Sequence, residues 1–210
     1  MVSASSIAAT VTTILIGALS DYIGKRKIFI CGGYILWGIS IFSFALAEKI
    51  AAALGVPVEV YDFTLPENRT EPKVYAADQL VVFGTPVYAG RVPNKMLPIV
   101  QSNFKGEGAL AVPVVTFGNR NFDNGLIELR NELENNGFHT IAGAGVVCEH
   151  VFSDKLAAGR PNEEDWTKLS AFAEEVAAKV KAMTEIPAPI AVRGDDPVGP
   201  YYTPLGTDGK

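Results

Sequence analysis

The sequence predicts an α/β domain with a doubly wound parallel sheet, preceded by an apolar helical hairpin. From residue 48 to residue 184, short apolar runs alternate with amphipathic stretches, as in strands and helices that follow one another along a parallel sheet. Residues 1–47 carry only four charged side chains, whereas the remainder of the 210 residues holds 15 basic and 22 acidic ones. We therefore divide the chain into an apolar hairpin (1–46), an α/β domain (47–186) and a Pro/Gly-rich tail (187–210).

The hairpin is predicted from two uncharged stretches, residues 1–20 and 28–47, each long enough to cross ~30 Å of hydrocarbon as a helix. The segment between them reads Gly-Ala-Leu-Ser-Asp-Tyr-Ile-Gly-Lys-Arg-Lys. It resembles the loop between the second and third membrane helices of major facilitator superfamily transporters. The resemblance implies a transporter-derived fragment and membrane association through residues 1–47. It covers two helices of a twelve-helix family, so we expect no transport activity.

The α/β domain is predicted element by element. We expect a helix over 47–54 that ends at Gly55, and a strand over 58–63 because Val58-Glu-Val60 alternates. The continuous apolar runs 80–83 and 110–117 predict strands buried on both faces. The remaining expected elements are helices over 96–104 and 124–136, a strand over 140–148, and a last helix that follows the cap residue Asn162.

Charge and cysteine content exclude several functions. The formal net charge of −5 argues against nucleic-acid binding as the main function. Cys31 and Cys148 are far apart and only two histidines are present, so the sequence predicts no zinc site, no disulfide framework and no iron–sulfur cluster within this chain. We also expect no metal ligand and no catalytic residue.

Two loops carry the functional signal. Residues 84–94 and 116–124 each follow a predicted buried strand, and both are rich in Gly, Asn and aromatic residues. In parallel α/β sheets, ligands bind beyond the carboxyl ends of the strands. We therefore expect the two loops to form one ligand site.

These loops, together with residues 148–160 and their Glu-His-x-Phe-Ser run, resemble the flavodoxin-like domain of bacterial flavodoxin–ferredoxin fusion proteins. The resemblance covers about residues 47–204. It implies a flavodoxin-like sheet of order 2-1-3-4-5, FMN as cofactor, electron transfer, a redox partner protein such as a ferredoxin or a reductase, and a cytoplasmic location for this part. Residues 199–204 resemble the segment that leads into the ferredoxin half, so we expect the chain to be truncated before that domain.

The resemblance also assigns roles in the two loops. Tyr88 would offer a face to the flavin ring, backbone groups of the first loop would reach the ring edge, and the second loop would line the opposite side. Arg120 would offset negative charge on the reduced ring or bind a partner. The expected cofactor-binding residues are Ser43, Thr85, Pro86, Val87, Tyr88, Ala89, Gly90, Thr116, Phe117, Gly118, Asn119, Arg120 and Phe122.

Two flavodoxin features are altered in this sequence. The family's phosphate loop, Ser/Thr-x-Thr-Gly-x-Thr, is matched in place by residues 43–47, where only Ser43 keeps a hydroxyl. Because each lost charge-assisted hydrogen bond costs ~1.5–3 kcal/mol, we expect much weaker FMN binding. Strand 1 is replaced or degenerate: residues 35–42 have the β-branched and aromatic composition to fill its place, but they also suit the second half of a membrane helix.

Three alternatives to a simple electron carrier remain open at this point. The first is a flavin-dependent NAD(P)H or quinone oxidoreductase. The second is a non-catalytic chimeric membrane-transporter fragment. The third is a folded domain without flavin that serves an interaction role.

Overall fold

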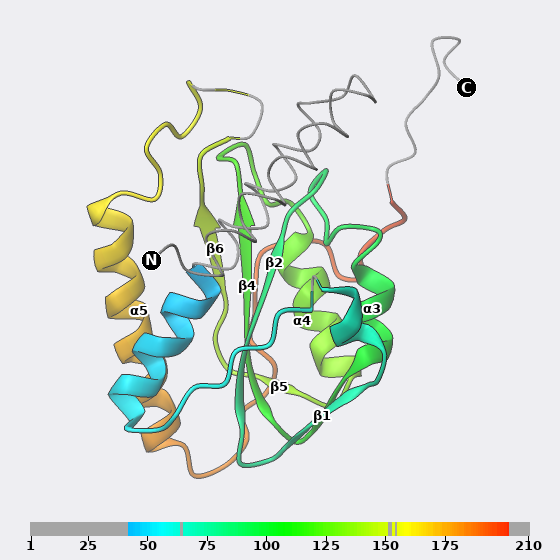
Figure 1. The fold of residues 1–210 in the computed structure, drawn as a ribbon, viewed down its shortest axis with the longest axis vertical. Helices are drawn as coiled ribbons and strands as arrows, with labels where there is room; N and C mark the ends of the chain where they lie inside the picture. The colour runs from blue at the N-terminus through cyan, green and yellow to red at the C-terminus, as the bar shows by residue number, and fades with distance from the viewer. Residues whose placement is uncertain (1–41, 64, 151–152, 154, 202–210) are drawn as a thin grey trace, which may run out of the picture.

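A computed structural model of the chain describes residues 42–63, 65–150, 153 and 155–201 (Figure 1). The expected hairpin over residues 1–46 therefore lies outside the described residues, apart from 42–46. The first described element is a helix over 42–54, which is unlabelled in Figure 1. The labelled elements are η1 (Pro66–Arg69), β1 (Lys73–Ala76), β2 (Leu80–Pro86), α3 (Leu97–Asn103), β3 (Phe104–Glu107), β4 (Leu110–Phe117), α4 (Gly125–Asn135), β5 (His139–Thr140), β6 (Ala144–Val147) and α5 (Glu163–Ala182).

The central sheet is parallel throughout. β2 pairs with β4 along its whole length, with Leu80 opposite Leu110 and Pro86 opposite Thr116. On the other side of β4, β5 pairs with the start of the strand and β6 with its end. A second small parallel sheet joins β1 to β3 and was not expected from the sequence. The α/β class with parallel strands is confirmed.

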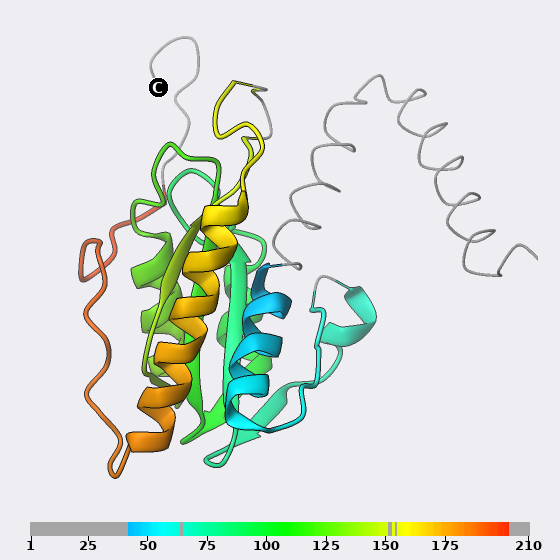
Figure 2. The ribbon, with the colours of Figure 1, turned by 90° about the vertical axis from the view of Figure 1, so that its left-hand side faces the viewer.

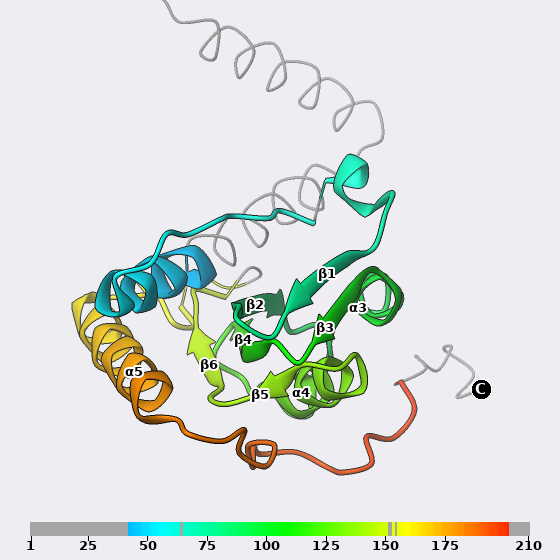
Figure 3. The same cartoon turned by 90° about the horizontal axis from the view of Figure 1, so that it is seen from below.

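Helices cover both faces of the central sheet (Figure 3). The helix over 42–54 and α5 lie on one face, where Phe42 stacks on Trp166 with 4.7 Å between ring centroids. α3 and α4 lie on the other face and bury Val100, Leu129 and Leu133. Such burial of both faces explains why β2 and β4 are apolar runs rather than alternating ones.

Most of the predicted elements are confirmed, including the last helix with Asn162 as its cap. There, the Asn162 side chain accepts from the Asp165 N–H and the Asp165 side chain accepts from the Asn162 N–H, which is a capping box. The predicted helix over 124–136 ends at Gly137, whose φ of 84° is the left-handed conformation that glycine tolerates.

Three sequence-based predictions are wrong. Residues 42–46 are helical, so they are neither the phosphate-type loop nor the end of a substitute strand. Residues 58–63 form no strand, because no described strand offers them a ladder of hydrogen bonds. The predicted strand over 140–148 is interrupted and divides into β5 and β6.

The described part of the Pro/Gly-rich tail, residues 187–201, runs along the outside of α4 (Figure 3). Figure 2 shows this segment and the helix over 42–54 on opposite sides of the molecule. Within the described residues, no helix has both the length and the apolar character needed to span a bilayer.

Candidate functional site

The loop after β2 begins with a tight turn. The N–H of Tyr88 donates to the carbonyl of Arg91 (2.9 Å), and the N–H of Arg91 donates back to the carbonyl of Tyr88 (3.1 Å). The two central residues have positive φ, 50° at Ala89 and 79° at Gly90, as a type I′ turn requires. The turn leaves Tyr88 42% exposed at the carboxyl end of the sheet.

The loops after β2 and β4 contact each other directly. The N–H of Asn124 donates to the carbonyl of Gly90 (2.9 Å), and the N–H of Val87 donates to the carbonyl of Thr116 (2.9 Å). A Cβ at Gly90 would lie 2.8 Å from the Cβ of Asp123, so only glycine permits this approach. The structure thus brings the two predicted loops together at one edge of the sheet.

The second loop is held largely by its own contacts. Asn119 and Asp123 have positive φ, 63° and 40°, and the exposed Arg120 forms an ion pair with Asp123. The rings of Phe117 and Phe122 meet edge to face, 5.2 Å apart. The carboxylate of Asp123 therefore already balances part of the charge that Arg120 would offer to a ligand.

A third loop, after β6, flanks the second one. Gly118 approaches His150 so closely that a Cβ would lie 2.7 Å from the imidazole Cδ2. The N–H of Cys148 donates to the carbonyl of Phe117 (2.9 Å). Burial raises the pKa of the Cys148 thiol to about 11, so this cysteine stays protonated and is a poor nucleophile at neutral pH.

The first loop opens into a groove between β2 and the segment 56–63, which we call the β2-edge groove. Its volume is about 1450 Å³. The expected site residues that line it are Ser43, Thr85, Pro86 and Tyr88. Burial raises the pKa of the Tyr88 hydroxyl above its usual value.

The other expected site residues do not line this groove. Val87 packs against Gly125, Thr116 is 6% exposed within β4, and Phe122 packs against Gly145. Of the remaining members of the set, Ala89 and Gly90 lie in the loop after β2, and Phe117 is the last residue of β4. Gly118, Asn119 and Arg120 lie in the loop after β4.

The site suits the ring of a flavin better than its phosphate. An exposed tyrosine beside the N–H groups of a tight turn can contact a planar ring on its face and edge. At the other end, Phe42 and Leu46 are 2% and 0% exposed and fill the helix face with apolar atoms. The Ser43 hydroxyl is buried and has no hydrogen-bond partner in the part of the chain that the structure describes; it is the only side-chain donor in residues 42–47. A phosphate dianion needs several donors, so the fit fails there.

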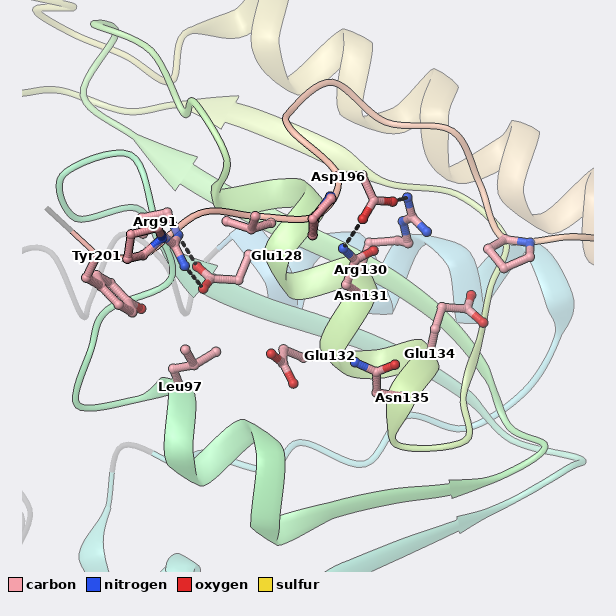
Figure 4. A pocket seen from close by; sticks show the side chains of 14 residues that line it. Arg91, Leu97, Glu128, Arg130, Asn131, Glu132, Glu134, Asn135, Asp196 and Tyr201 are labelled. Carbon is pink, nitrogen blue, oxygen red and sulfur yellow. Dashed lines mark hydrogen bonds and ion pairs between the residues drawn. The ribbon is translucent and has the colours of Figure 1, made fainter.

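A second cavity, of about 590 Å³, lies between α4 and the tail (Figure 4). Arg91 binds Glu128 through two hydrogen bonds (2.5 and 3.0 Å), and the same carboxylate accepts from the N–H of Val92 (2.9 Å). The Arg91 guanidinium also donates to the carbonyl of Gly199 (2.8 Å) and lies 4.3 Å from the ring centre of Tyr201. No sequence pattern indicates this cluster, because its members are far apart along the chain.

Among the described residues, no group of three or more histidine, cysteine or acidic side chains is arranged to hold a metal ion. No family model matches the sequence. No curated protein matches it either.

Proposed function

We propose that the domain binds a flavin ring at the carboxyl end of its parallel sheet and serves in electron transfer. The observation that carries this proposal is the joining of the two loops through Gly90 and Asn124, beside a groove that opens next to Tyr88. Parallel α/β sheets place ligand sites at this edge. Bound FMN would supply reversible uptake of one or two electrons.

The proposed flavin site implies a particular order of strands in the sheet. We infer a flavodoxin-like order 2-1-3-4-5, in which β2, β4 and the β5/β6 pair occupy the places of strands 3, 4 and 5. The parallel pairing of β2 with β4, and of β4 with both β5 and β6, supports this part of the order. The place of strand 1 corresponds to the β2-edge groove, and segment 56–63 to the place of strand 2.

Four residues of the two loops have a role in the proposed flavin site. Tyr88 stacks on one face of the flavin ring, and the N–H groups of Ala89 and Gly90 reach its edge. Arg120 lies on the neighbouring loop, where its charge attracts a reduced flavin or an acidic redox partner. Because the phosphate end lacks donors, the ring contributes most of the affinity.

Flavin titration tests this proposal. We expect FMN and riboflavin to bind with dissociation constants within about threefold of each other, since the phosphate gains no charge-assisted bonds. Quenching of flavin fluorescence by the full chain measures both constants. No quenching by the protein, or FMN binding 100-fold tighter than riboflavin (about 2.7 kcal/mol), would contradict the proposal.

Variants of Tyr88 locate the site. We expect Tyr88→Ala to weaken flavin binding by about three- to tenfold and Tyr88→Phe to restore it, because the ring and not the hydroxyl makes the stacking contact. Tyr201→Phe, which alters a tyrosine beside Arg91 on the tail side and outside the β2-edge groove, is the matched control. Steady-state oxidation of NADH with a quinone as acceptor distinguishes the oxidoreductase alternative. An oxidoreductase turns over NADH, whereas a pure electron carrier does not.

A further inference from the structure

Arg91 holds both the turn that carries Tyr88 and helix α4. Its backbone N–H and carbonyl form the two hydrogen bonds with Tyr88 that close the turn (3.1 and 2.9 Å). Its guanidinium forms two hydrogen bonds with the carboxylate of Glu128 (2.5 and 3.0 Å), as Figure 4 shows. One residue therefore links the position of Tyr88, beside the β2-edge groove, to α4.

The link to α4 is rigid because the ion pair is buried and doubly bonded. The side chains of Arg91 and Glu128 are 12% and 5% exposed. The same carboxylate accepts from the N–H of Val92 (2.9 Å), so it holds two consecutive residues of the loop. A guanidinium that bonds a carboxylate through two parallel N–H groups fixes the direction of the contact as well as its length.

The described tail contacts both loops of the candidate site. In the first loop, the Arg91 guanidinium donates to the carbonyl of Gly199 (2.8 Å). In the second loop, the side chain of Asn124 exchanges two hydrogen bonds with Asp195 (2.9 and 3.0 Å), and its backbone N–H donates to the carbonyl of Gly90 (2.9 Å). The tail, which follows α4 in Figure 3, therefore bridges the two loops.

The contacts at position 91 require an arginine. The planar guanidinium presents N–H groups in fixed directions, and here they reach Glu128 and the carbonyl of Gly199 at the same time. A lysine ammonium would keep the positive charge, but it cannot bond both carboxylate oxygens in one plane. Arg91→Lys therefore separates the effect of bond geometry from that of charge.

We propose that Arg91 is a positioning residue, which couples docking of the tail to the binding of a planar ring at Tyr88. The docked tail and α4 fix the guanidinium, and the guanidinium fixes the turn. Equilibrium coupling is reciprocal, so a ring that binds better to the fixed turn also stabilises the docked tail by the same factor. The coupling to a flavin rests on the proposed function, whereas the fixing of the turn does not depend on it.

Hydrogen exchange of the full chain, without flavin, tests whether Arg91 fixes the turn. We expect the amides of Tyr88 and Arg91 to exchange at least ~10-fold faster in Arg91→Lys, because a lost charge-assisted hydrogen bond makes opening easier by about that factor. Amides in the last turn of α5, on the opposite face of the sheet, open without breaking this contact and should be unchanged. Equal exchange of the turn in Arg91→Lys and in the unmodified chain would overturn the proposal.

Arg130→Lys is the matched control. Arg130 is 16% exposed, lies two residues after Glu128 on α4, and pairs with Asp196 of the same tail (3.4 Å) rather than with the turn. A lysine at this position can still pair with Asp196, so the tail stays docked, and exchange at Tyr88 and Arg91 should change by less than ~2-fold. An acceleration as large as that in Arg91→Lys would contradict a specific role for Arg91.

A tail variant covers the case in which Arg91→Lys does not fold. Gly194 has φ of 141°, and a Cβ there would lie 3.0 Å from the Cβ of Ile127, so Gly194→Ala displaces the tail. Without the Gly199 contact, the amides of Tyr88 and Arg91 should exchange at least ~3-fold faster. Gly199→Ala keeps the carbonyl, and its Cβ would meet nothing within 4 Å, so exchange should be unchanged. Equal exchange in the two glycine variants would mean that the tail does not position the turn.

Limited proteolysis tests the coupling to a ring, with riboflavin as the probe because it carries the ring without the phosphate. We expect saturating riboflavin to slow trypsin cleavage after the exposed Arg193 at least ~3-fold in the unmodified chain, and Arg91→Lys should lose this slowing. Cleavage of a small peptide by the same trypsin controls for an effect of flavin on the protease.

The outcomes separate this inference from the proposed function. Riboflavin that binds without slowing cleavage would overturn the coupling and leave the proposed function standing. A chain that binds no riboflavin would refute the proposed function, and exchange without flavin would then decide alone whether Arg91 couples the tail to the turn.

Discussion

The two sides of the domain differ in how their chain segments are held. Residues 187–201, a Pro/Gly-rich segment, are held beside α4 by hydrogen bonds with Arg91 and Asn124 and by an ion pair with Arg130. Residues 56–62, an alternating apolar segment, lie along the β2-edge groove without a strand partner among the described residues. A Pro/Gly-rich composition is typical of a linker, and an alternating apolar composition is typical of a paired strand. Each segment behaves in the opposite way, so the available hydrogen-bond partners decide which segment is held.

The docked tail has contacts at several separate points. Asp195 exchanges two hydrogen bonds with Asn124 (2.9 and 3.0 Å). Asp196 accepts from Asn131 (3.2 Å) and pairs with Arg130 (3.4 Å). On the groove side, Lys73 and Glu59 form the corresponding ion pair (3.2 Å), but Glu59 is 84% exposed there.

The largest effect is expected when the buried ion pair is broken. Glu128→Ala removes a carboxylate that is 5% exposed and leaves Arg91, 12% exposed, without its main partner. An uncompensated buried charge costs about 3–5 kcal/mol of the free energy of unfolding. Urea unfolding followed by circular dichroism measures this loss. Glu132→Ala, which removes one exposed hydrogen bond to Gln101, is the control. Equal losses of unfolding free energy in the two variants would show that burial does not determine how much the Arg91–Glu128 pair stabilises the protein.

A smaller effect is expected at a glycine of the tail. Gly194 has φ of 141°, and a Cβ there would lie 3.0 Å from the Cβ of Ile127. Gly194→Ala should therefore strain the backbone by about 1–3 kcal/mol and free the tail. Trypsin cleavage after the exposed Arg193 should become faster. Gly199→Ala, where a Cβ would meet nothing within 4 Å, should leave cleavage unchanged. A resistant Gly194→Ala protein would mean that the tail is not docked as described.

The hydroxyl of Tyr201 makes the tail contact pH-dependent. It donates to the carbonyl of Val92, and burial together with Glu128 raises the pKa of Tyr201 to about 12. Because the folded pKa exceeds the ordinary value of 10, the contribution to stability is complete below about pH 10 and is lost between about pH 10 and pH 12. The ultraviolet titration of the unmodified chain minus that of Tyr201→Phe should show one group with a midpoint near 12. A midpoint near 10 would place Tyr201 in solvent.

Features set by local patterns were predictable from the sequence. The apolar run of β4 and the three- and four-residue periodicity of α5 each require only a nearby core, and both elements form as expected. That the loops after β2 and β4 lie together follows from the rule that parallel strands end at one edge, and the N–H of Asn124 does donate to the carbonyl of Gly90 there. Ser43 was expected in a loop but is helical, because the residues around it pack on α5.

Features that depend on distant partners were not predictable. Val58 and Val60 alternate like a strand, yet a strand also needs a neighbouring edge with which to pair. The tail is Pro/Gly-rich, yet Arg91 binds its Gly199 across more than a hundred residues of sequence. The interruption between β5 and β6 coincides with Gly143, where a Cβ would lie 3.0 Å from the side chain of Ile190 in the tail.

The smallest effect is expected at the ion pair beside the groove. Glu59→Ala breaks the bond to Lys73, but Glu59 is 84% exposed, and the Lys73 ammonium keeps its position 3.8 Å from the ring centre of Tyr61. Exposed pairs contribute little, so the free energy of unfolding should change by less than about 0.5 kcal/mol. The same urea titration as for Glu128→Ala gives the value directly. A loss above about 1 kcal/mol would mean that exposure does not limit the strength of this ion pair, and the contrast between the two sides would then not rest on burial.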